Sequence, residues 1–437
     1  MLVWFLLLLT VVWTVVYRYR RRNMYRLAAS IPAPKENLPV IGIAHVLTGN
    51  TEDIMTSLQK FSYSAMENDG FTRCWLSHIL YFVSIWRRRR KILVPAFSPK
   101  IVENFVDVFS EQSEKLVQLL RSCANVGNFS VWPFISTYTL DSVCETAMGV
   151  KINAQGNPNS IFLKSMNRVL NLVCERIFHL WLQPEWLFKL FPQSREHDHC
   201  IKQMHDFTDD VIRKKREKIK SEKLCKTEVD NDYDLGSYKR NTFLDLLITL
   251  SGGEKGYNNE ELREEVLTLA VAGTDTSAVA VCNTLKLVVK ESLRLFPPVP
   301  FIIRKVLEDT KLPSGRTMPA GSGIVVSIWG LHRDPKYWGP DAEHFDPDRF
   351  LPERFNVPPC SYMPFSSGPR NCLGYQYALM SVKTALSAVL RRFKVVGEQE
   401  EGPIPKIRVK LDIMMKAVDG YELALERRTE TSSSAQG

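Results

Sequence analysis

Apolar residues recur at helical spacing through much of the chain. Between residues 86 and 220 they fall three and four positions apart, as at 102, 105, 106 and 109 and again at 116, 119 and 120. This spacing predicts a series of amphipathic helices. A polar stretch from 221 to 241 predicts a surface loop, and the helical pattern resumes near Glu260. The first half of the chain is therefore expected to be mostly helical.

The pattern changes after the run Pro-Pro-Val-Pro at 297–300, because proline ends a helix. Two short runs rich in β-branched residues, 301–306 and 323–329, predict strands. A proline-rich loop then extends to Ser367, and a last amphipathic helix is expected from about Leu373. The expected fold is one mostly α-helical domain with a little sheet over residues 41–426. A Thr/Ser-rich tail at 427–437 is expected to be disordered.

The N-terminal segment has the pattern of a membrane anchor. Residues 2–16 are apolar apart from two threonines, and arginines follow at 18, 20, 21, 22 and 26. A cleaved signal peptide carries its positive charges before the apolar run, so this order favours an anchor at 1–17. By the positive-inside rule the rest of the protein would then face the cytosol. A basic, proline-rich hinge is expected at 18–40, and a buried or interfacial helix remains the alternative.

Composition leaves the partner of the protein open. Of the 437 residues, 45% are hydrophobic and 24% are charged, which is typical of a globular protein. A net charge of +9 suits nucleic acid, an anionic membrane or an acidic protein, but no nucleic-acid motif favours the first. The nine cysteines are scattered without a C-x-x-C pair, which fits a reducing compartment.

One cysteine stands out by its neighbours. Cys372 lies in a loop between Gly368 and Gly374, directly before the last expected helix. Backbone N–H groups at a helix start favour negative charge, so this sulfur is suited to be a thiolate. The two glycines let the backbone approach a flat macrocycle, and Arg370 adds a cation. A buried structural cysteine is the alternative, but it does not explain the whole spacing.

The run 365–374 resembles the haem-binding loop of the cytochrome P-450 family, F-x-x-G-x-R-x-C-x-G, with Phe365, Gly368, Arg370, Cys372 and Gly374 at every fixed position. The resemblance extends over nearly the whole chain and implies the family's helical fold around a haem. It implies haem b as cofactor, held non-covalently apart from a Cys372 thiolate bond to iron. In that family the thiolate donates electron density that favours O–O cleavage.

The segment Ala272-Gly-Thr-Asp-Thr-Ser places small residues and then an acid and an alcohol within a helix. Asp275 and Thr276 are suited to pass protons through water. The alternative is a glycine at a packed helix crossing with polar residues facing solvent. The family resemblance implies the first: Thr276 would order water beside the oxygen molecule, and Asp275 would relay protons.

Glu291 and Arg294 share one face of a helix, since they lie three residues apart. Such a pair is usually a surface ion pair. Because Leu-Phe-Pro-Pro and a strand follow, it resembles the family's E-x-x-R motif, whose usual third member would be Arg349. The resemblance implies that this triad braces the fold on the thiolate side of the haem.

Trp86 and Arg90 form an i, i+4 pair in a basic run that would ordinarily be a solvated face. The resemblance implies instead that both point to a haem propionate, with Arg304 and Arg370 as further propionate contacts. The remaining cations suit docking of an acidic electron donor: Arg87, Arg88, Arg89, Lys91, Lys383, Arg391 and Arg392.

Two further segments, 139–149 and 205–212, resemble family four of the cytochromes P-450 and its insect relatives. Mammalian members often carry a glutamate before the helix glycine that links covalently to haem. Ala272 stands there in this chain, so no such link is expected.

Two internal segments of the family pattern are missing. The sequence passes from 82–85 straight to Trp86 without the helices that normally cover the substrate pocket. Residues 260–296 contain no proline, and if all were helical they would form one rod of about 55 Å, which could not place both Asp275 and Glu291 correctly. We expect that this product lacks two segments, one at the junction 85–86 and one at 285–286, through alternative splicing or a faulty gene model.

The sequence therefore predicts a haem-thiolate monooxygenase of the endoplasmic reticulum membrane, with its catalytic domain in the cytosol. NADPH–cytochrome P-450 reductase and cytochrome b5 would be its electron donors, and its substrate would be lipophilic. Two alternatives remain open: a haem-thiolate isomerase or dehydratase, and an inactive or unstable product of the two losses.

Overall fold

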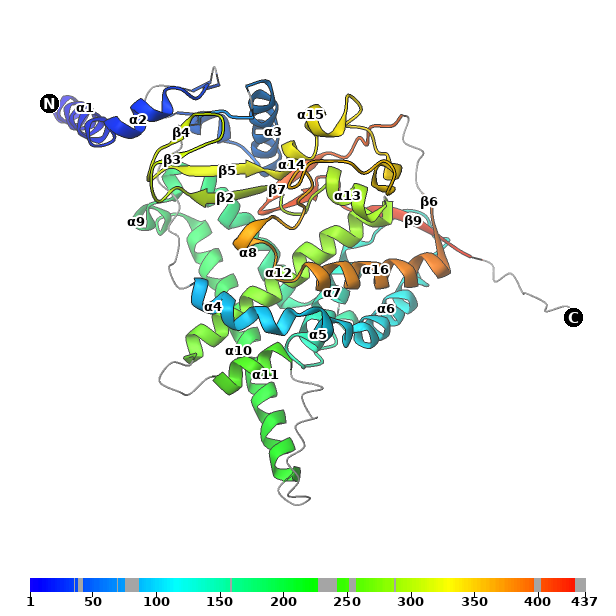
Figure 1. Cartoon of the computed structure of the whole chain (residues 1–437). Helices are drawn as coiled ribbons and strands as arrows, with labels where there is room; N and C mark the ends of the chain where they lie inside the picture. The colour runs from blue at the N-terminus through cyan, green and yellow to red at the C-terminus, as the bar shows by residue number, and fades with distance from the viewer. Residues whose placement is uncertain are drawn as a thin grey trace, which may run out of the picture.

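The computed structural model describes residues 1–34, 36–37, 42–68, 70–74, 86–157, 159–226, 242–250, 257–286, 288–396 and 402–428. Over these ranges the chain is mostly helical, as expected (Figure 1). The helices are α1 (Leu2–Arg20), α2 (Arg22–Ala28), α3 (Thr51–Glu67), α4 (Trp86–Leu93), α5 (Pro99–Glu103), α6 (Val106–Leu120), α7 (Trp132–Thr146), α8 (Ile161–Phe178), α9 (Glu185–Phe188), α10 (Pro192–Lys226), α11 (Phe243–Leu250), α12 (Asn259–Lys286), α13 (Val289–Leu295), α14 (Ile328–Leu331), α15 (Pro335–Trp338) and α16 (Tyr375–Arg392).

The strands form small antiparallel sheets. The strands are β1 (Phe129–Ser130), β2 (Phe301–Lys305), β3 (Thr310–Lys311), β4 (Thr317–Met318), β5 (Gly323–Ser327), β6 (Phe393–Val396), β7 (Val409–Asp412), β8 (Met414–Ala417) and β9 (Glu422–Arg427). β2 pairs with β5, β3 with β4 and β7 with β8, while β9 lies between β1 and β6. The expected strands at 301–306 and 323–329 thus form one hairpin, with Phe301 opposite Ser327.

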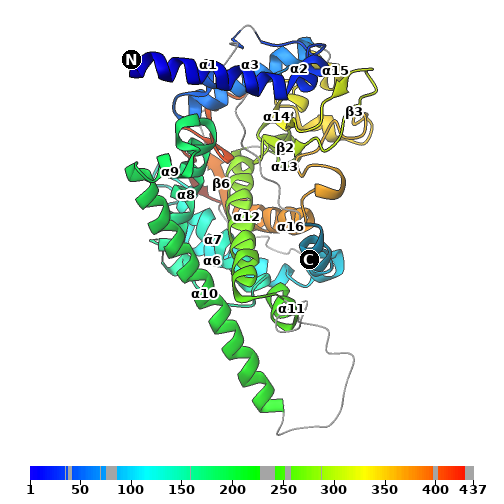
Figure 2. The same cartoon turned by 90° about the vertical axis from the view of Figure 1, so that its left-hand side faces the viewer.

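α12 runs through the middle of the molecule, with α7, α10 and α16 around it (Figure 2). Its small residues allow this close packing. A β carbon on Gly273 would lie 2.6 Å from the side chain of Val143 in α7, so only glycine fits this crossing. The packed-crossing alternative therefore explains Gly273.

The chain does not continue as one helix from 260 to 296. α12 ends at Lys286, Val288 is extended (φ −81°, ψ 140°), and α13 begins at Val289. The expectation of a single straight rod was wrong, because a β-branched residue in extended conformation ends the helix without a proline. Residue 287 lies outside the described residues.

Other boundaries also differ from those expected. α10 extends to Lys226, where a loop from 221 was expected, because the run is rich in helix formers; residues 227–241 lie outside the described residues. The second strand ends at Ser327, whose hydroxyl accepts the Gly330 N–H and caps α14. Arg427 belongs to β9 rather than to a disordered tail, and 429–437 lie outside the described residues.

The N-terminal apolar run forms α1, which continues to Arg20, past the expected anchor boundary at residue 17. Its large apolar side chains face outward: Trp4 is 76% exposed and Trp13 61%. Figure 1 shows α1 extending away from the body of the molecule. Among the described residues, the segment Asn259–Leu285 of α12 is long and apolar enough to cross a membrane, but most of it is buried in the core.

Candidate functional site

The loop that carries Cys372 ends immediately before α16, as the sequence predicts. The Cys372 N–H donates to the carbonyl of Phe365 over 2.8 Å. Between them Ser366 (φ 63°) and Gly368 (φ 75°) turn the backbone through the left-handed region. A β carbon on Gly368 would meet no atom within 4 Å, so the backbone there faces open space. The Cys372 side chain is exposed beside it.

Opposing effects act on the pKa of the Cys372 thiol. Desolvation by the atoms around the sulfur raises the pKa of the Cys372 thiol, while the Gly374 N–H and the charge of Arg90 act in the opposite direction. The N–H at the helix start thus favours the thiolate, as expected, while desolvation opposes it. A bound metal ion deprotonates a coordinating thiol, so the thiolate would form with metal binding.

Phe365 and Gly374 frame the loop. The Phe365 ring packs near Tyr375 in the first turn of α16, with centroids 6.3 Å apart. Gly374 is the N-cap of that helix, and a β carbon there would make only an ordinary contact with Phe97. The backbone of Gly374 thus does not require glycine for its own conformation.

Three arginines from separate elements meet at this loop, and we call them the open arginine cluster: Arg90 of α4, Arg304 of β2 and Arg370. Arg90 donates to the carbonyl of Asn371 (2.8 Å) and to its side-chain oxygen (2.6 Å). Arg304 reaches the Ser366 hydroxyl at 3.4 Å. The guanidinium of Arg370 lies 3.5 Å from the centre of the Trp86 ring.

The open arginine cluster has no acidic partner among the described residues. Partial desolvation lowers the pKa of Arg370, and the positive charges of Arg304, Arg90 and Arg87 lower it further. Like charges placed together without a counter-charge are unfavourable, so the arrangement suits a ligand that brings negative charge. The sequence-predicted residues Trp86, Arg90, Arg304 and Arg370 are thus brought to one place.

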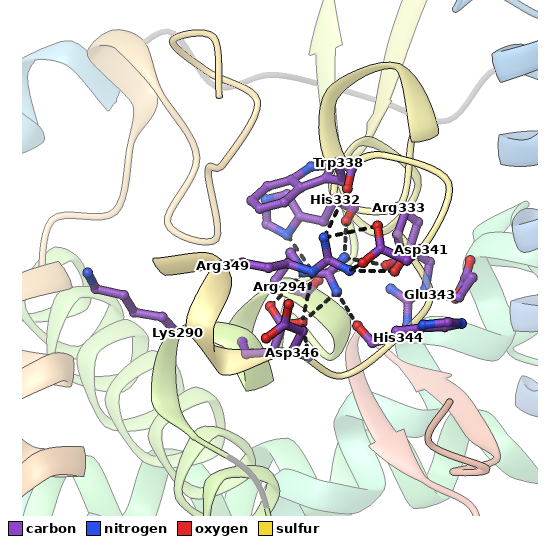
Figure 3. Close-up of polar contacts among 12 residues, drawn as sticks. Lys290, Arg294, His332, Arg333, Trp338, Asp341, Glu343, His344, Asp346 and Arg349 are labelled. Atoms are coloured by element: carbon purple, nitrogen blue, oxygen red, sulfur yellow. Dashed lines mark hydrogen bonds and ion pairs between the residues drawn. The ribbon is translucent and has the colours of Figure 1, made fainter. Parts of the chain in front are cut away.

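The triad residues also meet, but in the interior. Both carboxylate oxygens of Glu291 accept from Arg294, at 2.6 and 2.7 Å, and both side chains are fully buried. The guanidinium of Arg349 lies 3.8 Å from Glu291 and is anchored to the Asp341 carbonyl at 2.6 Å. Figure 3 shows these arginines enclosed by carbonyl and carboxylate groups from the loop after α15.

Asp275 and Thr276 lie on different faces of α12. Thr276 is partly exposed on the same side as Ala272, whose carbonyl accepts its hydroxyl hydrogen at 2.5 Å. Asp275 is fully buried, and its carboxylate lies 2.8 Å from the ammonium of Lys416 in β8. Burial raises the pKa of Asp275, and Lys416 partly offsets this. The structure does not bring the two predicted catalytic groups together.

Comparison with known proteins identifies the lineage. The family model described as Cytochrome P450 matches residues 51–287 and 283–422. This chain belongs to the cytochrome P450 family. It is 34% identical to cytochrome P450 4d2 of Drosophila melanogaster over 405 residues, covering 81% of this chain and 78% of the relative. It is 32% identical to cytochrome P450 4V2 of Homo sapiens over 433 residues, covering 89% and 81%. The resemblance to family four is thus confirmed.

The residues of this cytochrome P450 fit the haem that its family implies. Cys372 would supply the thiolate ligand to its iron. The open side of Gly368 accepts a flat ring, and the open arginine cluster matches the carboxylates of a porphyrin.

Sequence reasoning missed two residues at this site. Lys416, the buried partner of Asp275, also donates to Asn167 at 3.0 Å and lies over the Trp132 ring. His332 contacts both the triad and the loop before Cys372. Neither lies in a local motif, since the hydrogen bonds and ion pair of their side chains join residues more than 30 positions away.

Proposed function

We propose that this cytochrome P450 is a membrane-bound monooxygenase that inserts one atom of O2 into a lipophilic substrate. The proposed substrate classes are fatty acids, hormones, odorants and xenobiotics. The observation that supports it most is the exposed Cys372 sulfur beside the open arginine cluster. When bound, haem would supply the electron transfer and oxygen chemistry.

In this proposal the protein's own residues have separate tasks. Cys372 would bind the iron, with Arg90, Arg304, Arg370 and Trp86 holding the propionates. Thr276 would present its hydroxyl to water by releasing the Ala272 carbonyl. Asp275 would move a proton only when its contact with Lys416 opens, because a paired and buried carboxylate cannot reach the solvent.

Electrons would come from NADPH through an acidic reductase or cytochrome b5. Of the cations expected to dock it, Arg88 and Arg89 pair with glutamates of α12, and Arg392 pairs with Glu114. Four have no acidic partner among the described residues: Arg87, Lys91, Lys383 and Arg391. The last two line a cleft of about 470 Å³ between α6 and α16. These cations support a docking face for carboxylates.

We propose that the anchor is α1 and that the membrane is the endoplasmic reticulum. The outward-facing apolar side chains of α1, followed by the arginines at 18–22, support this placement. The globular part would then lie in the cytosol.

We also propose that two internal segments are absent from this product. The two stretches of the family match meet at 283–287, which is where the second loss was expected. The junction at 85–86 adjoins 75–85, which lie outside the described residues. Sequencing the transcript across both junctions tests this: a message with no longer form anywhere would contradict it.

Turnover with isotopically labelled dioxygen tests the function itself. The full chain in membranes, with reductase and NADPH, is expected to transfer one labelled oxygen atom to a fatty-acid or xenobiotic probe. Product formation without NADPH would favour an isomerase or dehydratase instead. Haem binding without any turnover would favour an inactive product.

A further inference from the structure

His332 lies between the buried triad and the loop that carries Cys372. It follows α14 and is fully buried. Its ring stacks on Tyr362, with centroids 5.2 Å apart, and meets Trp338 edge-on. Its own carbonyl accepts from Arg294 at 2.7 Å (Figure 3). The imidazole is thus packed against two aromatic rings.

Both ring nitrogens of His332 contact backbone groups. Nδ1 lies 3.1 Å from the carbonyl of Arg294, and Nε2 lies 2.9 Å from the N–H of Met363. A carbonyl only accepts and an amide N–H only donates, so the contacts require a neutral ring with its hydrogen on Nδ1. Burial and the charges of Arg333 and Arg294 lower the pKa of His332 to about 3, in agreement with that form.

Met363 begins the turn that leads to the cysteine. Its carbonyl accepts the Ser366 N–H at 2.9 Å, and the next carbonyl but one, that of Phe365, accepts the Cys372 N–H. Ser366 and Gly368 hold left-handed backbone angles within the same turn. A non-glycine residue in that region is strained and persists only when its surroundings fix it. The Met363 N–H is one of those fixed points.

We propose that His332 is a positioning residue: its neutral Nε2 holds the Met363 N–H and so fixes the Cys372 loop against the Glu291–Arg294 pair. This rests on the proposed function only in that Cys372 is taken as the iron ligand. The consequence is that the position of the sulfur depends on one hydrogen-bond acceptor outside the haem-binding motif.

Two substitutions of His332 distinguish the role of Nε2 from that of Nδ1. The side chain of His332→Gln can place an oxygen where Nε2 lies, and so retains the acceptor for Met363. That of His332→Asn can replace Nδ1 but has no atom at Nε2. Hydrogen exchange in a peptide covering 361–374 of the haem-free full chain is the first readout. It is expected to rise about tenfold in the Asn variant and to stay near wild type in the Gln variant.

The second readout is the carbon monoxide spectrum of the reduced, haem-loaded protein. The thiolate-ligated fraction is expected to fall in the Asn variant and to be retained in the Gln variant. The control is Trp338→Phe, which removes a hydrogen bond to the Leu331 carbonyl and touches the same ring, but makes no bond to the loop. It is expected to leave loop exchange unchanged.

Equal loop exchange in the Asn and Gln variants would overturn the proposal, as would a tenfold rise in the Gln variant. Exchange in α7 reports whether each variant is folded. If the Asn variant does not fold, the Gln variant alone decides. A wild-type protein without a thiolate-ligated band would contradict the proposed function. The exchange measurement on the haem-free chain would still test whether His332 holds the Met363 N–H.

Discussion

The molecule contains two groups of arginines that differ in what surrounds them. Arg294 and Arg349 lie in the interior, where Glu291, Asp341 and backbone carbonyls surround them. The open arginine cluster contacts carbonyl, amide and hydroxyl oxygens and the Trp86 ring, and no carboxylate among the described residues. The first group is neutralised by the protein. The second carries uncompensated charge at the edge of the Cys372 loop.

This difference separates structural arginines from ligand-binding ones. A buried charge without its partner is strongly destabilising, so each arginine of the interior group requires its carboxylate. A partly exposed charge tolerates the lack of a partner because water screens it. The open arginine cluster can therefore stay without a protein carboxylate and bind the carboxylate of a ligand. Substitutions in the interior group should mainly lower the free energy of unfolding, whereas substitutions in the open arginine cluster should mainly lower the affinity for haem.

The largest effect is expected from Glu291→Gln. It leaves the fully buried Arg294 without its counter-charge and should lower the free energy of unfolding by about 3–5 kcal/mol. Denaturant unfolding of the purified chain measures this. The matched control is Glu52→Gln, which breaks the exposed pair with Arg408 and should cost no more than about 1 kcal/mol. Equal effects of the two substitutions would contradict the distinction.

Arg370→Gln should show the opposite signature. It removes a repelled, exposed cation, so the free energy of unfolding of the haem-free chain should change by less than about 1 kcal/mol. Haem affinity should fall about tenfold or more, as expected for one lost charge-assisted hydrogen bond. Titration of haem into the haem-free chain measures the affinity. An unchanged affinity, or a large loss of stability, would place Arg370 with the structural arginines.

Asp275 gives a smaller, pH-dependent contrast. Burial raises its pKa above the ordinary 3.8, so the folded state holds the proton more tightly than the unfolded state does. The stability that protonated Asp275 contributes is fully present below its ordinary pKa, and it is lost as pH rises through the pKa in the folded state. The wild type should therefore lose stability relative to Asp275→Asn as pH increases from about 4. Unfolding curves of both proteins at several pH values measure how the difference in their free energies of unfolding changes with pH. A wild type that gains stability relative to the variant as pH rises would refute the prediction.

The sequence predicts these features unequally. The Cys372 loop and the Glu291–Arg294 pair could be found because their chemistry requires fixed short spacings. The break at Val288 could not, since a single β-branched residue is common inside helices and no proline marks the position. Lys416 and His332 were missed because burial, not local pattern, gives them their roles. The desolvation that opposes the thiolate at Cys372 could not be predicted either, since it depends on atoms distant in the sequence.

The most direct test of this account is the carbon monoxide spectrum of the reduced full chain beside that of Cys372→Ser. The account predicts a thiolate-ligated Soret band in the wild type and its loss in the serine variant, with the open arginine cluster intact in both. A serine variant that binds haem with an unchanged spectrum would contradict it.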